Sequence, residues 1–267
     1  MIPFKDDRGL ARLPVITFAL VVASVVGYVL AAVHGGSLIG GPSGETVARF
    51  GAIPYEFAHW GQHCAVGAAG FGQAVLCSGQ HGVIGRVGPQ PATWETAFTA
   101  MFLHANVLAL AVNMIFLGAF GASVEDRVGR LAFLGFYLVG GLVALALQVL
   151  VAPGSATPML GASGAIAAVL GAYIVLYPRA KIRTLVLALL RVTFVELAAW
   201  VVVVTWFAVD AILGAVGLST AFGGGAGISY YAHWGGFAFG VVVALALLGR
   251  HREQGAAVGR ARESAGA

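Results

Sequence analysis

Six long apolar runs constrain this chain more than any other feature of its sequence. They cover residues 13–33, 102–121, 131–151, 160–177, 194–216 and 230–248. A helix needs about 20 apolar residues to cross a hydrocarbon core of about 30 Å, and lipid forces each run to be helical because it offers backbone amides no hydrogen bond. Only 10% of the 267 residues are charged, against about 25% in soluble domains. The sequence therefore predicts an all-α membrane protein, a bundle of six transmembrane helices.

The basic residues predict the orientation of this bundle. With six spans both termini lie on one side, and 13 of the 15 Lys and Arg residues fall on that side. The exceptions, Arg49 and Arg86, share one long loop. Because cytoplasmic segments are rich in Lys and Arg, we expect both termini to be cytoplasmic. The chain then comprises a cytoplasmic N-terminus (1–12), a membrane domain (13–249) with a long extracytoplasmic loop (34–98), and a basic cytoplasmic tail (250–267).

The charge balance requires no nucleic-acid partner. The net charge of +4 follows from the topology, and no basic helix with interleaved aromatic residues indicates a nucleic-acid site. The expected partners are membrane lipid and proteins in the membrane. The oligomeric state is not encoded in any pattern that we recognise, and no metal or organic cofactor is implied.

Cys64 and Cys77 are the two cysteines of the chain, and both fall in the long outer loop. Outside the cytoplasm a disulfide is the ordinary state of such a pair. His59, His63 and His81 flank the pair, so a zinc site is an alternative, although the spacing fits no compact zinc-finger pattern. Unpaired thiols are the third possibility. We expect the disulfide.

Strongly polar side chains inside the predicted spans are costly in lipid and are therefore candidates for function. They are His104, Asn106, Asn113, Ser163, Glu196, Asp210 and His233. Each also fits a structural role when taken alone. Asn113 can bond across helices, Glu196 lies near a membrane surface, and His233 can be a satisfied interior histidine. Asp210 is either a packing or solvated acid, or it lines the substrate gate near His233.

Ser163 and His233 stand out because they share a depth. Each lies about three residues, or about 5 Å, inside a span that starts from the outer side. Glycines surround both residues, which allows the two helices to approach closely. A serine hydroxyl beside an imidazole is the minimum for nucleophilic acyl transfer, since the ring removes the serine proton and later protonates the leaving amine.

These motifs resemble those of the rhomboid intramembrane serine proteases. The resemblance rests on Gly161-Ala-Ser-Gly164 in the fourth span and on Ala232-His233-x-x-Gly236-x-x-x-Gly240 in the sixth. The stretches His104-Ala-Asn106 to Asn113-Met114 and Val124-Glu125-Asp126-Arg127-x-Gly129 are also similar to the family's. The resemblance covers roughly residues 95–248, and a GxSG motif alone would be weak because unrelated hydrolases carry it.

The resemblance implies a six-helix rhomboid-like bundle that cleaves membrane-anchored proteins in or near their transmembrane segments. It assigns Ser163 as nucleophile and His233 as general base, with no aspartate as a third member. Asn113 matches an asparagine that binds the oxyanion beside the amide of Ser163, and we place Gly161 in the same oxyanion and substrate region. Ala109 stands where many members carry a second histidine.

This departure keeps a second function open, a catalytically weak or inactive rhomboid-like protein that binds membrane proteins. A transporter is a further alternative, although the paired interrupted helices of transporters are not evident. The membrane class and basic content lead us to expect a bacterial-type cytoplasmic membrane, with the active site opening to the extracytoplasmic side. The physiological substrate and the cleavage-site preference cannot be read from the sequence.

Overall fold

The structure is a computed structural model that describes residues 2–6, 9–69, 72–80, 83, 88–188, 191–215 and 229–265. Its helices are α1 (Val15–Val33), α2 (Gly44–Phe50), α3 (Pro54–Ala58), α4 (Thr93–Thr99), α5 (Val107–Phe116), α6 (Ala122–Val128), α7 (Arg130–Val151), α8 (Ser163–Leu176), α9 (Ala199–Ala215) and α10 (Ser229–Ala265), and a π-helical turn η1 (Leu117–Gly121) joins α5 to α6. The strands are β1 (Ile2–Asp6), β2 (Cys64–Ala69), β3 (Gly72–Cys77), β4 (Lys181–Ala188) and β5 (Arg191–Ala198).

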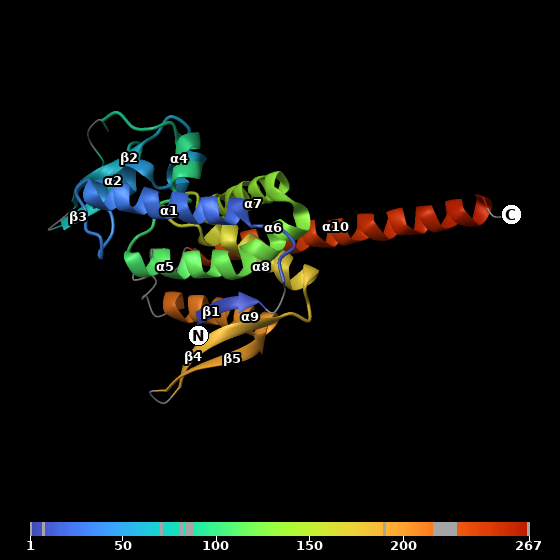
Figure 1. Ribbon diagram of the computed structural model, residues 1–267. Coiled ribbons are helices and arrows are strands. Elements are labelled where there is room, and N and C mark those ends of the chain that lie inside the picture. Colours follow the sequence, from blue (N-terminus) through green and yellow to red (C-terminus); the bar gives the residue numbers. More distant parts are fainter. Residues whose placement is uncertain are drawn as a thin grey trace.

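The long helices form a bundle, and α10 extends far beyond the rest of it (Figure 1). Within the described residues, four helical stretches are long and apolar enough to cross a membrane. They are Val15–Val33, Val107–Val128, Arg130–Val151 and Tyr230–Gly249. The fourth and fifth predicted spans contain shorter apolar helices, Ser163–Leu176 and Ala199–Ile212. The structure thus supports a mostly helical membrane bundle, whereas six full spans, the orientation of the termini and the division at residues 12 and 249 stay predictions.

The all-α prediction is wrong for the segment before α9. Residues 194–198, predicted to begin the fifth span, belong to β5, which pairs antiparallel with β4 from Lys181↔Ala198 to Ala188↔Arg191. The N-terminal strand β1 adds to the other edge of β4. Both β4 and β5 contain β-branched residues, and β5 also contains Phe194; residues of these types pack well on a pleated surface. The sheet lies beside α9 (Figure 1).

Helix α8 occupies the centre of the bundle, with every residue from Ala165 to Tyr173 buried. It contacts α10 backbone to backbone through glycines. A methyl group on Gly236 would overlap the carbonyl oxygen of Gly164, and one on Gly240 would overlap that of Ala168. From the other side, a methyl on Gly171 would overlap the carbonyl oxygen of Phe237. Only glycine lets the two helices lie this close.

A buried carboxylate joins α6 to the start of α1. Glu125 is 2% exposed and accepts hydrogen bonds from the amides of Ile16 (3.0 Å) and Thr17 (2.7 Å) and from the Thr17 hydroxyl. The first amides of a helix have no acceptor within it, and the helix dipole favours an anion there. The neighbouring Asp126 accepts from the amides of Ala11 and Arg12. The Glu-Asp pair of the sequence motif therefore anchors the chain entering the first helix.

The outer loop is folded and lies on the segment that leads into α8. Cys64 and Cys77 face each other across the β2–β3 hairpin and are joined in a disulfide, so neither sulfur is free to bind zinc. His81, one of the flanking histidines, lies outside the described residues. Ala52 exchanges two backbone hydrogen bonds with Met159 (3.1 and 2.8 Å). The loop thereby supports the chain immediately before Ser163.

Substituting Gly240 tests the contact between α8 and α10. We expect Gly240→Ala to lower the melting temperature of the protein in detergent, because overpacking of this kind costs about 1–3 kcal/mol or more. Gly135→Ala on α7 is the matched control, since a methyl there meets nothing within 4 Å. Equal melting temperatures for the two variants would contradict the proposed packing role.

Glu56 provides a pH-dependent test of the loop. Its carboxylate accepts a hydrogen bond from the Cys64 amide at 2.7 Å. Burial raises the pKa of Glu56, and the Cys64 amide and the nearby His63 oppose the shift only in part. The folded chain therefore holds this proton more readily than the unfolded chain, and the stability from Glu56 is lost as the pH rises from the ordinary glutamate pKa through the raised one.

We expect Glu56→Gln to melt above the wild type at about pH 8 and to lose that advantage towards about pH 4, where the carboxyl is largely protonated in both states. Its amide oxygen can still accept from Cys64. Glu45→Gln, at an exposed position of the same loop, is the control and should change little. A Glu56→Gln melting temperature below the wild-type value at about pH 8 would show that the charge is stabilising.

Candidate active site

Ser163 is the first residue of α8, and the local backbone explains how it is presented. Gly161 has φ +108°, a conformation that side chains with a Cβ rarely adopt. It turns the chain into the helix two residues before the serine. Ala162 precedes the first turn, and the Ile166 amide already donates to its carbonyl at 2.9 Å. The amides of Ser163, Gly164 and Ala165 therefore precede the first intrahelical donor of α8.

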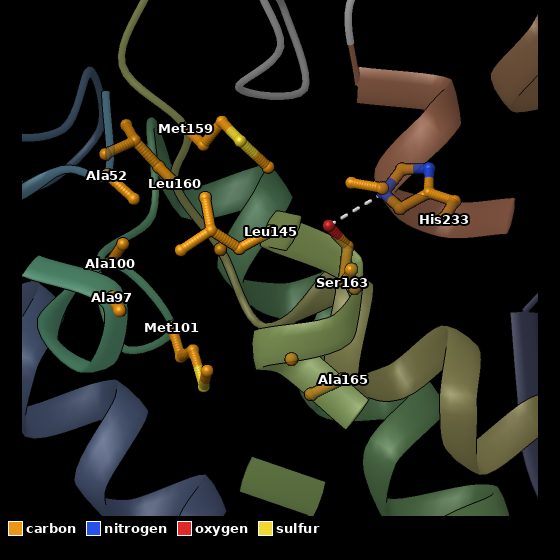
Figure 2. Close-up of a pocket in the computed structure, with 15 residues that line it drawn as sticks. Ala52, Ala97, Ala100, Met101, Leu145, Met159, Leu160, Ser163, Ala165 and His233 are labelled. Atoms are coloured by element: carbon orange, nitrogen blue, oxygen red, sulfur yellow. Dashed lines mark hydrogen bonds between the residues drawn. The ribbon is translucent and has the colours of Figure 1, made fainter. Parts of the chain in front are cut away.

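His233 lies in the first turns of α10 and contacts this serine directly. Its Nε2 is 2.8 Å from Ser163 Oγ (Figure 2). The sequence analysis predicted that the two side chains can meet, and they lie within hydrogen-bonding distance of each other. Gly236 and Gly240, which follow His233 on α10, contact the backbone of α8 just after Ser163. The close packing of the two helices therefore also brings the serine and the histidine together.

Asp210 completes a line of three side chains. Its Oδ2 lies 2.7 Å from His233 Nδ1. An ionised carboxylate only accepts hydrogen bonds, so in this arrangement Nδ1 carries the proton and donates it. Nε2 is then free to accept the hydrogen bond from the Ser163 hydroxyl. The sequence left Asp210 between a packing role and a place near His233, and the structure brings it to the histidine.

Asn113 and Ser163 both lie beside Gly161. The Nδ2 atom of Asn113 is 3.5 Å, and Ser163 Oγ 3.8 Å, from the point where a Cβ on Gly161 would lie. The Gly161 amide is not a free donor, however, because it donates to the Ala100 carbonyl at 2.9 Å. Gly161 therefore contributes the turn, and the side-chain amide of Asn113 lies beside it.

The other polar residues of the predicted spans lie elsewhere. Asn106 precedes α5, and its side chain accepts from the Ala109 amide at 2.9 Å, so it caps the helix. Glu196 lies in β5 with a side chain that is 64% exposed, 4.0 Å from Lys181. His104 is buried and is not among the described residues that line the pocket at Ser163. Ala109 occupies the position where the resemblance leads one to expect a second histidine. None of these three side chains is among the described residues that line the pocket in its place.

A pocket opens beside the dyad and is lined mainly by small and apolar side chains (Figure 2). Its walls come from the outer loop, α4, α7, the segment before α8, and α10. The lining residues include Ala97, Ala100, Met101, Leu145, Met159 and Leu160, together with Ser163 and His233. On the other side of the imidazole lies the indole of Trp206, with ring centroids 4.9 Å apart. The serine is thus accessible from the pocket while the histidine is packed from α9.

Comparisons with known proteins point to one family. The model of the Rhomboid domain matches residues 91–250. The chain is 39% identical over 83 residues to the zebrafish (Danio rerio) presenilin-associated rhomboid-like protein A, mitochondrial. These residues make up 30% of this chain and 22% of that protein. It is 34% identical over 145 residues to the Saccharomyces cerevisiae rhomboid protein 1, mitochondrial, covering 53% of this chain and 38% of that protein.

A third relative, the Bos taurus presenilin-associated rhomboid-like protein, mitochondrial, is 32% identical over 94 residues, 34% of this chain and 25% of that protein. The chain thus matches less than half the length of each of these relatives. All three carry the word mitochondrial in their names. This finding contradicts the expected bacterial-type cytoplasmic membrane. The expectation failed because an asymmetry of basic residues distinguishes the two sides of a membrane and not one kind of membrane from another.

Proposed function

The chain belongs to the rhomboid family, and from this premise we propose that it is an intramembrane serine endopeptidase that cleaves membrane-anchored proteins in or near their transmembrane segments. One observation carries the proposal, the 2.8 Å contact between His233 Nε2 and Ser163 Oγ beside an open pocket. A structural serine has no need of an imidazole aligned on its hydroxyl, whereas an acyl-transfer nucleophile depends on one.

The proposed reaction follows from the positions of these atoms. Ser163 Oγ attacks the scissile carbonyl carbon, and its proton passes to His233 Nε2. The tetrahedral intermediate collapses when the C–N bond breaks and the leaving nitrogen takes that proton. A water then attacks the acyl-enzyme, giving one proton to His233, and the ester bond to Ser163 breaks as that proton returns to Oγ. The protein is regenerated and one water has been consumed.

The negative oxygen of each intermediate requires hydrogen-bond donors. Two are available near Ser163 Oγ. One is the Ser163 amide, at the start of α8, where the helix dipole also favours negative charge. The other is Asn113 Nδ2, which lies 3.5 Å from the position that a Cβ on Gly161 would occupy. Ala109, one turn before Asn113 on α5, provides no third donor, so we expect a moderate intrinsic rate.

The short length of α8 suits a protease that works within the membrane. Its 14 residues span about 21 Å, less than the hydrocarbon core of about 30 Å. If the outer helices span the bilayer, Ser163 lies below the membrane surface. Non-helical backbone is tolerated at such depth only where it is buried in protein or lines a wet cavity, and the segment before α8 is bonded to Ala52 and Ala100.

We further infer that the substrates are transmembrane proteins and, from the names of the relatives, that the membrane is mitochondrial. The alternative function, binding of membrane proteins without cleavage, is favoured by one observation, the alanine at position 109. Both functions use the same bundle and the same pocket. They differ in whether Ser163 reacts.

A cleavage assay separates the protease function from the binding function. Purified wild-type protein in lipid vesicles should cleave a co-reconstituted transmembrane reporter, and Ser163→Ala and His233→Ala should each abolish cleavage while remaining folded. Ser24→Ala in α1 and His34→Ala at its C-cap change the same residue types away from the site; they are the controls and should keep the wild-type rate. Cleavage by Ser163→Ala would reject the proposed nucleophile. A wild-type protein that captures the reporter but leaves it intact would favour the binding function.

Asn113 can be tested as a donor to the oxyanion. We expect Asn113→Ala to lower kcat about 10²–10³-fold with a small change in KM, because an oxyanion donor acts mainly in the transition state. Asn113→Asp should be at least as slow, since it keeps the size of the side chain but places a carboxylate by the oxyanion. An unchanged kcat in a folded Asn113→Ala protein would leave the Ser163 amide as the working donor.

A further inference from the structure

Two side chains of α9 face His233. Asp210 and Trp206 are four residues apart, so they lie on the same face of the helix, one turn from each other. Asp210 Oδ2 is 2.7 Å from Nδ1 of the imidazole, and the Trp206 and His233 ring centroids are 4.9 Å apart at an interplanar angle of 54°. The histidine is therefore held by α9 on one side and meets Ser163 of α8 on the other.

The surroundings of Asp210 leave the imidazole as its partner. The side chain is 25% exposed, so water can reach the carboxylate and lower the cost of its charge. Asp210 is the one charged residue in the sequence of α9. Helix α8 carries no charged residue or histidine, and the one charged residue of α7 is Arg130 at its far end. Tyr230 on α10 is a further titratable group among the described residues near Asp210, and its hydroxyl donates to the Ala211 carbonyl at 3.5 Å.

Trp206 belongs to an aromatic cluster that packs against the helix carrying His233. It also packs against Phe116 of α5, with centroids 6.1 Å apart, and against Phe207, at 4.9 Å. Phe207 in turn contacts Trp234 and Phe237 of α10. The aromatic cluster fixes α9 against the helix that carries the histidine. The electron-rich face of an indole also favours a neighbouring cation, which suits a ring that becomes imidazolium during the reaction.

We propose that Asp210 is a positioning residue of the reaction, so that this chain works with a Ser163–His233–Asp210 relay. This inference rests on the proposed protease function. The carboxylate holds the proton on Nδ1, directs the free electron pair of Nε2 at the Ser163 hydroxyl, and stabilises the imidazolium that forms when Nε2 takes the serine proton. Asp210 does not itself become protonated, as in the soluble triads.

A fluorophosphonate probe tests the relay without a known substrate. Ser163 Oγ attacks phosphorus, fluoride leaves, and His233 takes the serine proton, so the labelling rate reports nucleophile activation alone. We expect Asp210→Asn to be labelled at least about 10²-fold more slowly near neutral pH, since the equivalent change in a soluble triad lowers kcat about 10⁴-fold.

Two variants make the comparison specific. Asp210→Glu keeps the carboxylate and should recover part of the rate. Glu196→Gln removes an exposed acid that pairs with Lys181 and should match the wild-type rate. If Asp210→Asn does not fold, Asp210→Ser takes its place with the same expected rate.

The outcomes separate this inference from the proposed function. A folded Asp210→Asn or Asp210→Ser protein with the wild-type rate would overturn the relay and leave the Ser–His dyad intact. A lower rate that Asp210→Glu does not recover at all would also overturn it, since a purely structural role predicts that pattern. Failure of the wild type to be labelled at Ser163 would reject the protease function and the relay together.

Discussion

The contact between the backbones of α8 and α10 is the constraint on which the rest of the structure depends. Lipid provides no hydrophobic drive for helix association, so close packing has to hold the bundle together. Glycines at 236 and 240 allow α10 to lie against the carbonyl oxygens of α8. This distance of approach brings His233 within 2.8 Å of Ser163. A side chain of any size in the contact would separate the helices and the reacting groups together.

The sequence predicts the helical membrane bundle well, because the requirement for apolar helices in lipid is stringent. It does not predict the strands, because a short apolar run rich in Val and Leu is compatible with either a strand or a buried helix. In β4 and β5 the pairing of the two segments with each other and with β1 decides the matter. The folded outer loop was equally hidden, apart from its disulfide, since the bonds of Met159 to Ala52 and of Gly161 to Ala100 join distant segments.

Within the site, residue type and depth were enough to pair Ser163 with His233. They did not decide the position of Asp210, because depth along a helix does not give the rotation of that helix about its axis. The four-residue spacing of Trp206 and Asp210 was a usable signal for a shared face, but not for which neighbour that face meets. The occupied amide of Gly161 and the capping role of Glu125 depend on partners far away in the chain, and no local pattern reveals such partners.

The burial of α8 by protein on every side also decides how the site responds to bilayer thickness. The outer helices carry the lipid-facing apolar residues, such as Phe18 on α1, Leu150 on α7 and Val242 on α10, each more than half exposed. A membrane that is thicker or thinner than these helices is accommodated by their tilt or by local deformation of the lipid. Protein surrounds residues 165–173 of α8, so hydrophobic mismatch acts on this helix through its neighbours. The depth of Ser163 is therefore set by the protein, and a substrate helix has to adjust to it.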